Sequence, residues 1–117
     1  MGKLTTHVLD TANGKPAQGI KVSLYRIDDD GLQPLLTTIT NDDGRTNAPL
    51  LIDDAFTSGL YQLVFSTAAY FRATNTTLDP VPFLDEIVIR FGISDENQHL
   101  HVPLLVSPYG YSTYRGS

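Results

Sequence analysis

Residues 99–117 read His99-Leu-His-Val-Pro-Leu-Leu-Val-Ser-Pro-Tyr-Gly-Tyr-Ser-Thr-Tyr-Arg-Gly-Ser117. Aliphatic residues occupy every second position of the first part, as in a half-buried β-strand, and Ser-Pro-Tyr-Gly is a turn signal. We therefore expect a strand over 99–107, a tight turn and a second strand over 110–115. Chain termini usually tolerate change. A terminal segment with this much pattern predicts that its last residues have a function.

The rest of the chain follows the same period of two. Turn signals of the Asn-Gly and Asp-Gly kind separate its segments. Further strands are expected over 3–10, 20–27, 33–40, 45–49, 60–66 and 85–93. Short strands joined by tight turns predict an all-β fold, an antiparallel β-sandwich. The segment 66–73 contains good helix formers behind a Ser or Thr that can cap them, which predicts one short helix.

Size and composition restrict the class of protein. A chain of 117 residues with 41% hydrophobic residues is expected to form one domain over 1–117. The net charge is −5 and the basic residues form no cluster, so nucleic acid is not an expected partner. There is no cysteine, and neither a signal peptide nor a membrane span is recognisable. These features predict a cytoplasmic protein.

The histidines fall in predicted strands, at His7, His99 and His101. Side chains alternate across a strand, so His101 shares one face with His99, Pro103 and Leu105. The opposite face is uniformly aliphatic and is the better core face. The face that carries His101 therefore points outward although it is apolar, and such faces are usually covered by a partner.

The residues alone leave several interpretations open. A strand histidine is most often structural or exposed, an arginine that follows Asp-Gly is most often solvated, and tyrosines most often pack. His99 and His101 have the spacing of two metal ligands, but a third would have to be His7 or a carboxylate, so a metal site is not expected. A Ser-His-Asp triad can be drawn, but the spacing selects none. No nucleophile elbow, P-loop or dinucleotide motif is present.

Four segments taken together carry a resemblance to a known family. They are Thr6-His7-Val8-Leu9-Asp10 with Gly14-Lys-Pro-Ala17, Asp43-Gly44-Arg45, His101-Val-Pro-Leu-Leu105, and Tyr114-Arg-Gly-Ser117. In this order, over essentially the whole chain, they resemble the 5-hydroxyisourate hydrolases, transthyretin-related enzymes of urate degradation. Hormone-carrying transthyretins share a similar fold but lack the last tetrapeptide. The resemblance implies a transthyretin-like (prealbumin-like) sandwich of seven to eight strands with one short helix.

The resemblance also implies an assembly, a reaction and a set of site residues. The assembly is a homotetramer, a dimer of dimers, with active sites between the dimers. The reaction is hydrolysis of 5-hydroxyisourate to 2-oxo-4-hydroxy-4-carboxy-5-ureidoimidazoline by lactam ring opening, with no metal or organic cofactor. The implied catalytic residues are His7, Arg45, His101 and Ser117, and the implied pocket-lining residues are Tyr114, Leu105 and Pro103.

Leu100 lies one residue and His99 two residues before the implied catalytic His101, and neither belongs to the implied set. The family often has Tyr where this chain has Leu100, which strand alternation places on the core face. We therefore expect this difference to change packing rather than catalysis. His99 is not one of the family's catalytic residues, and its place on the face of His101 leaves its role open, a supporting group being one option.

Two other functions fit the same fold. A small-molecule carrier like transthyretin would bind an aromatic ligand in the channel between dimers, but the presence of all the catalytic positions argues against it. A structural module of a larger surface protein is disfavoured, because no signal peptide, linker or cysteine is present.

Overall fold

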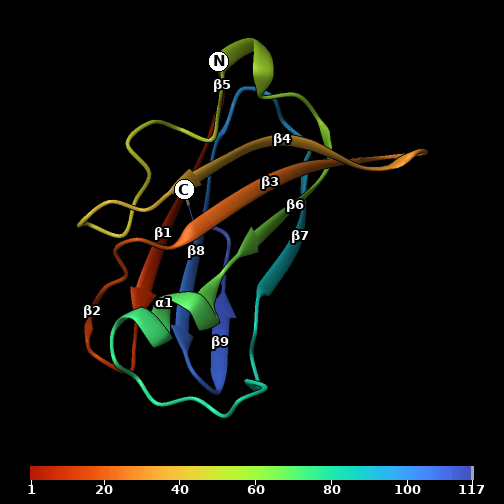
Figure 1. Cartoon of the computed structure of the whole chain (residues 1–117). Coiled ribbons are helices and arrows are strands. Elements are labelled where there is room, and N and C mark those ends of the chain that lie inside the picture. The colour runs from red at the N-terminus through yellow and green to blue at the C-terminus, as the bar shows by residue number, and fades with distance from the viewer. Residues whose placement is uncertain (117) are drawn as a thin grey trace.

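Two β-sheets and one short helix make up the fold (Figure 1). The structure is a computed structural model, and it describes residues 1–116. Its elements are β1 (Lys3–Asp10), β2 (Lys15–Pro16), β3 (Lys21–Asp28), β4 (Gly31–Ile39), β5 (Leu51–Ile52), a 3-10 helix (Asp53–Ala55), β6 (Gly59–Phe65), α1 (Thr67–Ala73), β7 (Ile87–Ile93), β8 (His99–Ser107) and β9 (Gly110–Thr113). One sheet has the order β2-β1-β8-β9 with β5 also paired to β1, and the other has the order β4-β3-β6-β7. The predicted β-sandwich with one short helix is confirmed.

The core lies between the sheets and contains the residues that the period-two pattern places inward. Leu4 and Val8 of β1, Leu24 of β3, Leu63 of β6 and Leu104 of β8 are all 0% exposed. Burying such a side chain contributes about 1.5–3 kcal/mol. A slip of one residue would turn a whole apolar set toward water, so this burial also fixes the register of each strand.

The direction of one strand pair differs from the prediction of an antiparallel sandwich. β1 pairs with β8 in parallel, while the other strand pairs are antiparallel. The parallel register places Thr5 opposite His101 and His7 opposite Pro103. The two ends of the chain therefore lie side by side, as the red and blue strands of Figure 1 show.

The strand expected over 45–49 is absent, and this prediction was wrong. Only Arg45 pairs there, in an isolated bridge to His7. The side-chain oxygen of Asn41 accepts hydrogen bonds from the backbone N–H groups of Asp43 (2.9 Å) and Arg45 (3.2 Å). These contacts hold the segment in a turn, and regular pairing with β1 resumes at β5.

The strand expected over 110–115 is shorter, because β9 ends at Thr113. Continuation of the β8–β9 register would place Pro103 opposite Tyr114. Proline has no N–H to donate to a ladder. The carbonyl of Pro103 instead accepts a hydrogen bond from the Thr113 hydroxyl (2.7 Å). The missing donor thus explains why the ladder stops at this point.

Helix α1 forms where the sequence predicted it, but without the expected cap. Ser66 precedes the helix and makes no side-chain hydrogen bond to it. The helix is held by burial of Ala68, Tyr70 and Phe71, and the backbone N–H of Ala68 donates to the Asp85 carbonyl (3.0 Å). Short helices depend on tertiary packing more than on their own propensity.

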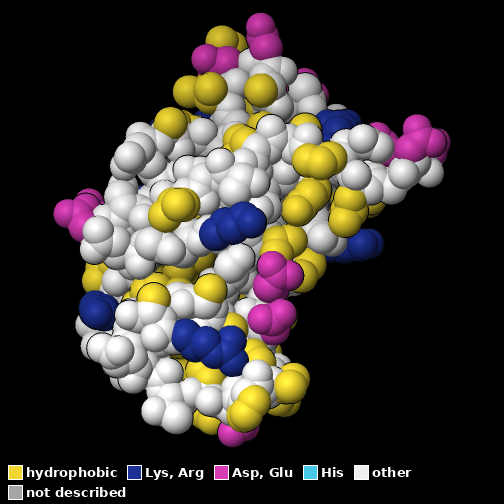
Figure 2. All heavy atoms as spheres, viewed as in Figure 1, with side chains coloured by type: hydrophobic (Ala, Val, Ile, Leu, Met, Phe, Trp, Pro, Cys, Tyr) yellow, Lys and Arg dark blue, Asp and Glu magenta, His cyan; other side chains and the backbone are white. Residues whose placement is uncertain are grey.

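The outer surface of β4 carries exposed hydrophobic side chains. Leu32 and Leu35 are each 43% exposed and Ile39 is 60% exposed. Figure 2 shows hydrophobic side chains over β3 and β4 and acidic side chains at the tip of their hairpin. Within the described residues, no helix is long and apolar enough to cross a membrane.

Candidate active site

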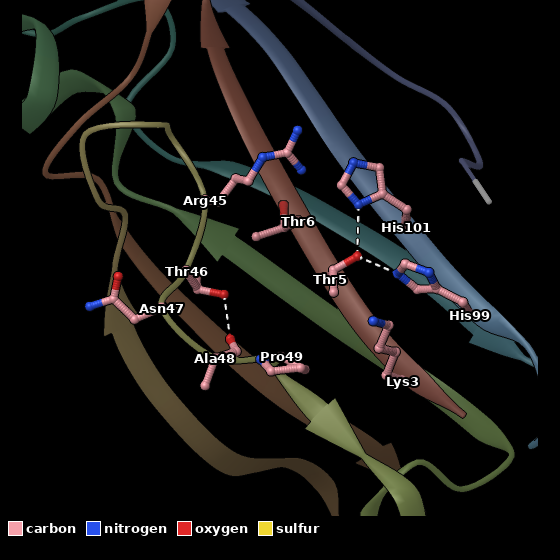
Figure 3. Close-up of a pocket in the computed structure, with 10 residues that line it drawn as sticks. All are labelled: Lys3, Thr5, Thr6, Arg45, Thr46, Asn47, Ala48, Pro49, His99 and His101. Atoms are coloured by element: carbon pink, nitrogen blue, oxygen red, sulfur yellow. Dashed lines mark hydrogen bonds between the residues drawn. The ribbon is translucent and has the colours of Figure 1, made fainter. Parts of the chain in front are cut away.

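The outer face of the β1–β8 pair brings together residues from three distant segments. His7 and Thr5 come from β1, His101 and His99 from β8, and Arg45 from the turn that crosses β1. An open cleft of about 490 Å³ lies on this face, and Thr5, Arg45, His99 and His101 line it (Figure 3). His7 and His101 are half-buried, whereas His99 and Arg45 are exposed. The cleft thus offers imidazole and guanidinium groups to a small polar molecule.

Gly44 explains how Arg45 reaches this face. Its backbone φ is +75°, and a Cβ at this position would collide with the carbonyl oxygen of Val8. The Gly44 carbonyl accepts a hydrogen bond from the Val8 N–H (2.8 Å), so the turn lies directly against β1. Only glycine fits such a contact at a positive φ. The Asp43-Gly44-Arg45 turn therefore places Arg45 beside His7.

Gly116 holds the terminal segment against His101 in a similar way. Its N–H donates to the His101 carbonyl (2.8 Å) in an antiparallel bridge. A Cβ on Gly116 would lie 2.9 Å from Cδ2 of the His101 ring, closer than side chains normally approach. Tyr114, 61% exposed, lines a second open cleft of about 780 Å³ together with His99 and His101.

The electrostatics of the site favour the neutral form of His7 and His101. Burial and the positive charge of Arg45 lower the pKa of His7, although the Asp43 backbone and carboxylate oppose this shift. Burial, Arg45 and the two neighbouring histidines lower the pKa of His101. Neutral imidazole is the form that can accept a proton, so both groups are available as bases near pH 7.

Most of the residues predicted for the site lie near one another. The structure brings His7, Arg45, His101 and Tyr114 to one surface, while Ser117 lies outside the described residues. Pro103 is buried and Leu105 is half-buried, and neither lines the two clefts described above. Leu100 lies in the core, 4% exposed, as strand alternation predicted. Within residues 1–116, no group of three or more acidic or histidine side chains is placed to hold a metal ion.

Sequence reasoning missed Thr5, whose hydroxyl contacts both His99 and His101 (Figure 3). Thr5 is two residues from His7 in β1, so the two side chains share a face. Its contact with the two histidines depends on the pairing of β1 with β8, and the local sequence pattern of a strand does not reveal which strand lies beside it.

Comparison with known proteins identifies the family. A family model described as the HIUase/Transthyretin family matches residues 4–116. The chain belongs to this family. The 5-hydroxyisourate hydrolase of Pseudomonas aeruginosa is 54% identical over 117 residues, which cover 100% of this chain and 93% of that protein. The resemblance found in the four motifs is therefore confirmed.

Solved structures of related proteins have the same fold as this chain. The crystal structure of (S)-allantoin synthase is 45% identical with a TM-score of 0.95, covering 99% of this chain and 44% of that chain. This chain therefore spans less than half the length of that protein. Sea bream transthyretin in complex with thyroxine is 27% identical with a TM-score of 0.87, covering 97% of this chain and 94% of that one. The same fold thus occurs in a synthase and in a transthyretin that binds thyroxine.

Proposed function

We propose that this chain is a 5-hydroxyisourate hydrolase, which opens the six-membered ring of 5-hydroxyisourate to give 2-oxo-4-hydroxy-4-carboxy-5-ureidoimidazoline. One observation carries the proposal: His7, Arg45 and His101 meet on one cleft-bearing face. A relative that is 54% identical over the whole chain bears the name of this activity. The alternative of a carrier does not call for two neutral histidines beside a guanidinium.

The proposed reaction needs a base, a stabiliser of negative charge and a means of holding a flat polar ring. Water attacks the C6 carbonyl carbon, and the histidine pair His7 and His101 takes the proton that the water loses. The C6–N1 bond then breaks, and the same proton is returned to N1 as it leaves. Histidine suits both proton transfers because its pKa lies close to neutrality.

Arg45 has two roles in this proposal. Its planar guanidinium donates hydrogen bonds to the ring oxygens and to the oxygen on which negative charge develops. Its charge also lowers the pKa of both histidines, after the larger effect of burial. The same group therefore stabilises the anionic intermediate and keeps the bases unprotonated before water attacks.

We propose that a second copy of the chain completes the site. The family resemblance implies a homotetramer, and an outward face with half-buried histidines and the apolar Leu105 suits coverage by another subunit. In that assembly Tyr114 and Leu105 form walls, Pro103 supports them from its buried position in β8, and Ser117 offers polar groups to the ring. A cytoplasmic location remains part of the same proposal. Sedimentation equilibrium tests the assembly, and a monomeric mass at micromolar concentration contradicts it.

The deciding experiment follows the ultraviolet decay of freshly made 5-hydroxyisourate with and without the purified protein. The expected result is decay well above the spontaneous rate, lost in His101→Ala. A rate equal to the spontaneous one overturns the enzyme assignment. Thyroxine binding without hydrolysis would favour a carrier instead. Removing residues 114–117 is expected to abolish turnover while the sandwich stays folded, and retained activity would exclude Tyr114 and Ser117 from the site.

A further inference from the structure

We infer that Thr5 is a positioning residue that decides which ring nitrogen of His101 is free to act as a base, through a chain of hydrogen bonds that ends at His99. This inference rests on the proposed hydrolase function, because it concerns the same site. Neither Thr5 nor His99 belongs to the catalytic set that the family resemblance implies. Both would act through His101 rather than on the substrate.

The two hydrogen bonds of the Thr5 hydroxyl have the same length. Its Oγ1 lies 2.8 Å from Nδ1 of His101 and 2.8 Å from Nε2 of His99 (Figure 3). The parallel register places Thr5 opposite His101 and Lys3 opposite His99, so the hydroxyl lies between the two imidazoles. The ring centroids are 6.4 Å apart, too far for a direct hydrogen bond. The hydroxyl is therefore the link between the rings.

A hydroxyl has one proton to donate, and this limits the arrangements. It cannot donate to both imidazoles, so at least one ring nitrogen must donate to the Thr5 oxygen. If His101 donates from Nδ1, its Nε2 carries a free lone pair when the ring is neutral. If Thr5 instead donates to Nδ1, the proton of neutral His101 lies on Nε2 and the free lone pair is lost.

We assign the first arrangement, in which the His101 Nδ1–H donates to Thr5 and the Thr5 hydroxyl donates to His99 Nε2. In this arrangement Nε2 of His101 can take the proton from water. The Nδ1–H bond to Thr5 also persists when His101 becomes positively charged, so no hydrogen bond has to break during catalysis. A partner on the second nitrogen is the usual way in which a protein selects the tautomer of a histidine.

Substitutions at Thr5 test this role with a matched pair of variants. Thr5→Val keeps the branched shape but removes the hydroxyl, and Thr5→Ser restores a hydroxyl. Thr5→Val is expected to lower kcat by about tenfold or more, the order seen for partners that orient metal-bound imidazoles. KM should stay within about twofold because the Thr5 hydroxyl is already bonded to the two imidazoles, and Thr5→Ser should recover most of kcat.

The control is Thr37→Val on the other sheet. Thr37 is also a strand threonine whose hydroxyl contacts another side chain, Ser23 (3.2 Å). Its loss should leave kcat unchanged. A kcat for Thr5→Val equal to that of the control overturns the inference, and so does a rise in KM at unchanged kcat.

A second readout does not depend on turnover. Nitrogen-15 NMR of the histidine rings reports which nitrogen carries the proton in the neutral state. Wild-type His101 is expected to be protonated on Nδ1, and Thr5→Val should shift the population toward Nε2. A wild-type His101 protonated on Nε2 sinks the assignment even if Thr5→Val fails to fold. Absence of hydrolysis by the wild type would remove the proposed function, whereas the tautomer would still test the Thr5 contact.

Discussion

Strand β1 carries two polar clusters that differ in how their hydrogen bonds are completed. At its end, Asp10 is 1% exposed and accepts from the N–H groups of Ala12 (3.0 Å) and Asn13 (2.9 Å). Its second oxygen accepts from the Asn13 side chain (2.7 Å) and the Tyr70 hydroxyl (2.7 Å). Three residues toward the start of the strand lies His7, on the opposite face of β1. On that face Thr5, Arg45, His99 and His101 line an open cleft.

The difference separates a structural cluster from a functional one. Every bond of Asp10 is made inside the chain, so nothing is left for a ligand. The groups at the cleft bond to one another only in part and keep donors and acceptors directed outward. Buried polar groups must be satisfied by the fold, whereas exposed ones can be completed by a substrate or another subunit.

The two clusters also differ in the protonation state that they favour: the first favours a charged carboxylate and the second a neutral imidazole. Burial alone would raise the pKa of Asp10, but hydrogen bonds from Asn13, Tyr70 and Ala12 outweigh it and hold that pKa below its usual value. Burial, and after it the hydrogen bond and charge of the same carboxylate, raises the pKa of Tyr70. At the cleft, burial and Arg45 lower the pKa of His101. The fold therefore keeps a charge on Asp10 and removes one from His101.

The largest expected effect is on activity at the cleft. His7→Ala, Arg45→Ala and His101→Ala should each lower kcat by roughly 10²–10⁴-fold, since removal of a general base or of a charge stabiliser has this magnitude. Melting temperatures should stay close to the wild-type value, because these side chains are not in the core. The ultraviolet assay and thermal melts measure both quantities. Near-normal turnover by either histidine variant would contradict the assigned roles.

The second effect is on stability at Asp10. Asp10→Ala leaves four donor groups without their acceptor, and we expect the free energy of unfolding to fall by about 3 kcal/mol. Tyr70→Phe removes one of these bonds and should cost about 1–2 kcal/mol. Activity per folded molecule should stay unchanged in both. Urea titrations measure the loss, and a matching fall in kcat would show that the clusters are not separate.

The third effect is the pH dependence of stability. The pKa of Asp10 is lower in the folded than in the unfolded chain, so the unfolded chain binds the proton more readily. The stabilisation is complete above the unfolded pKa, about 3.9, and is lost as pH falls through the lowered folded value. Urea titrations at several pH values should show this loss in the wild type and a smaller one in Asp10→Asn. Parallel curves for the two proteins would contradict it.

The smallest effect is a shift in the pKa of the site histidines. Arg45→Gln removes the positive charge that lowers both pKa values and leaves the effect of burial, so the pKa of both His7 and His101 should rise toward 6.5. NMR titration measures the shift directly, without turnover. Arg72→Gln serves as the control, because Arg72 bonds to the Asp79 carbonyl (3.1 Å) on a loop that follows α1. Equal titration curves in both variants would remove Arg45 from the electrostatics.

Much of the site was predictable because it depends on local pattern. The alternation along β8 placed Leu100 inward and His101 outward, and burial confirms both. The Asp43-Gly44-Arg45 motif marked the turn, although the strand expected after it does not form. The role of Gly44 required the contact with Val8, which lies on a different part of the chain. Thr5 was missed because its partners belong to the opposite end of the sequence.

The sequence by itself determined which residues share a face and which family the chain resembles. Both follow from the period of two and from short motifs, which need no knowledge of long-range pairing. Only the tertiary structure decided that β1 runs parallel to β8 and that Thr5 therefore lies between His99 and His101. Parallel and antiparallel pairing bury the same alternate residues. The pattern of a strand therefore specifies its core face but not the direction or register of the neighbour beside it.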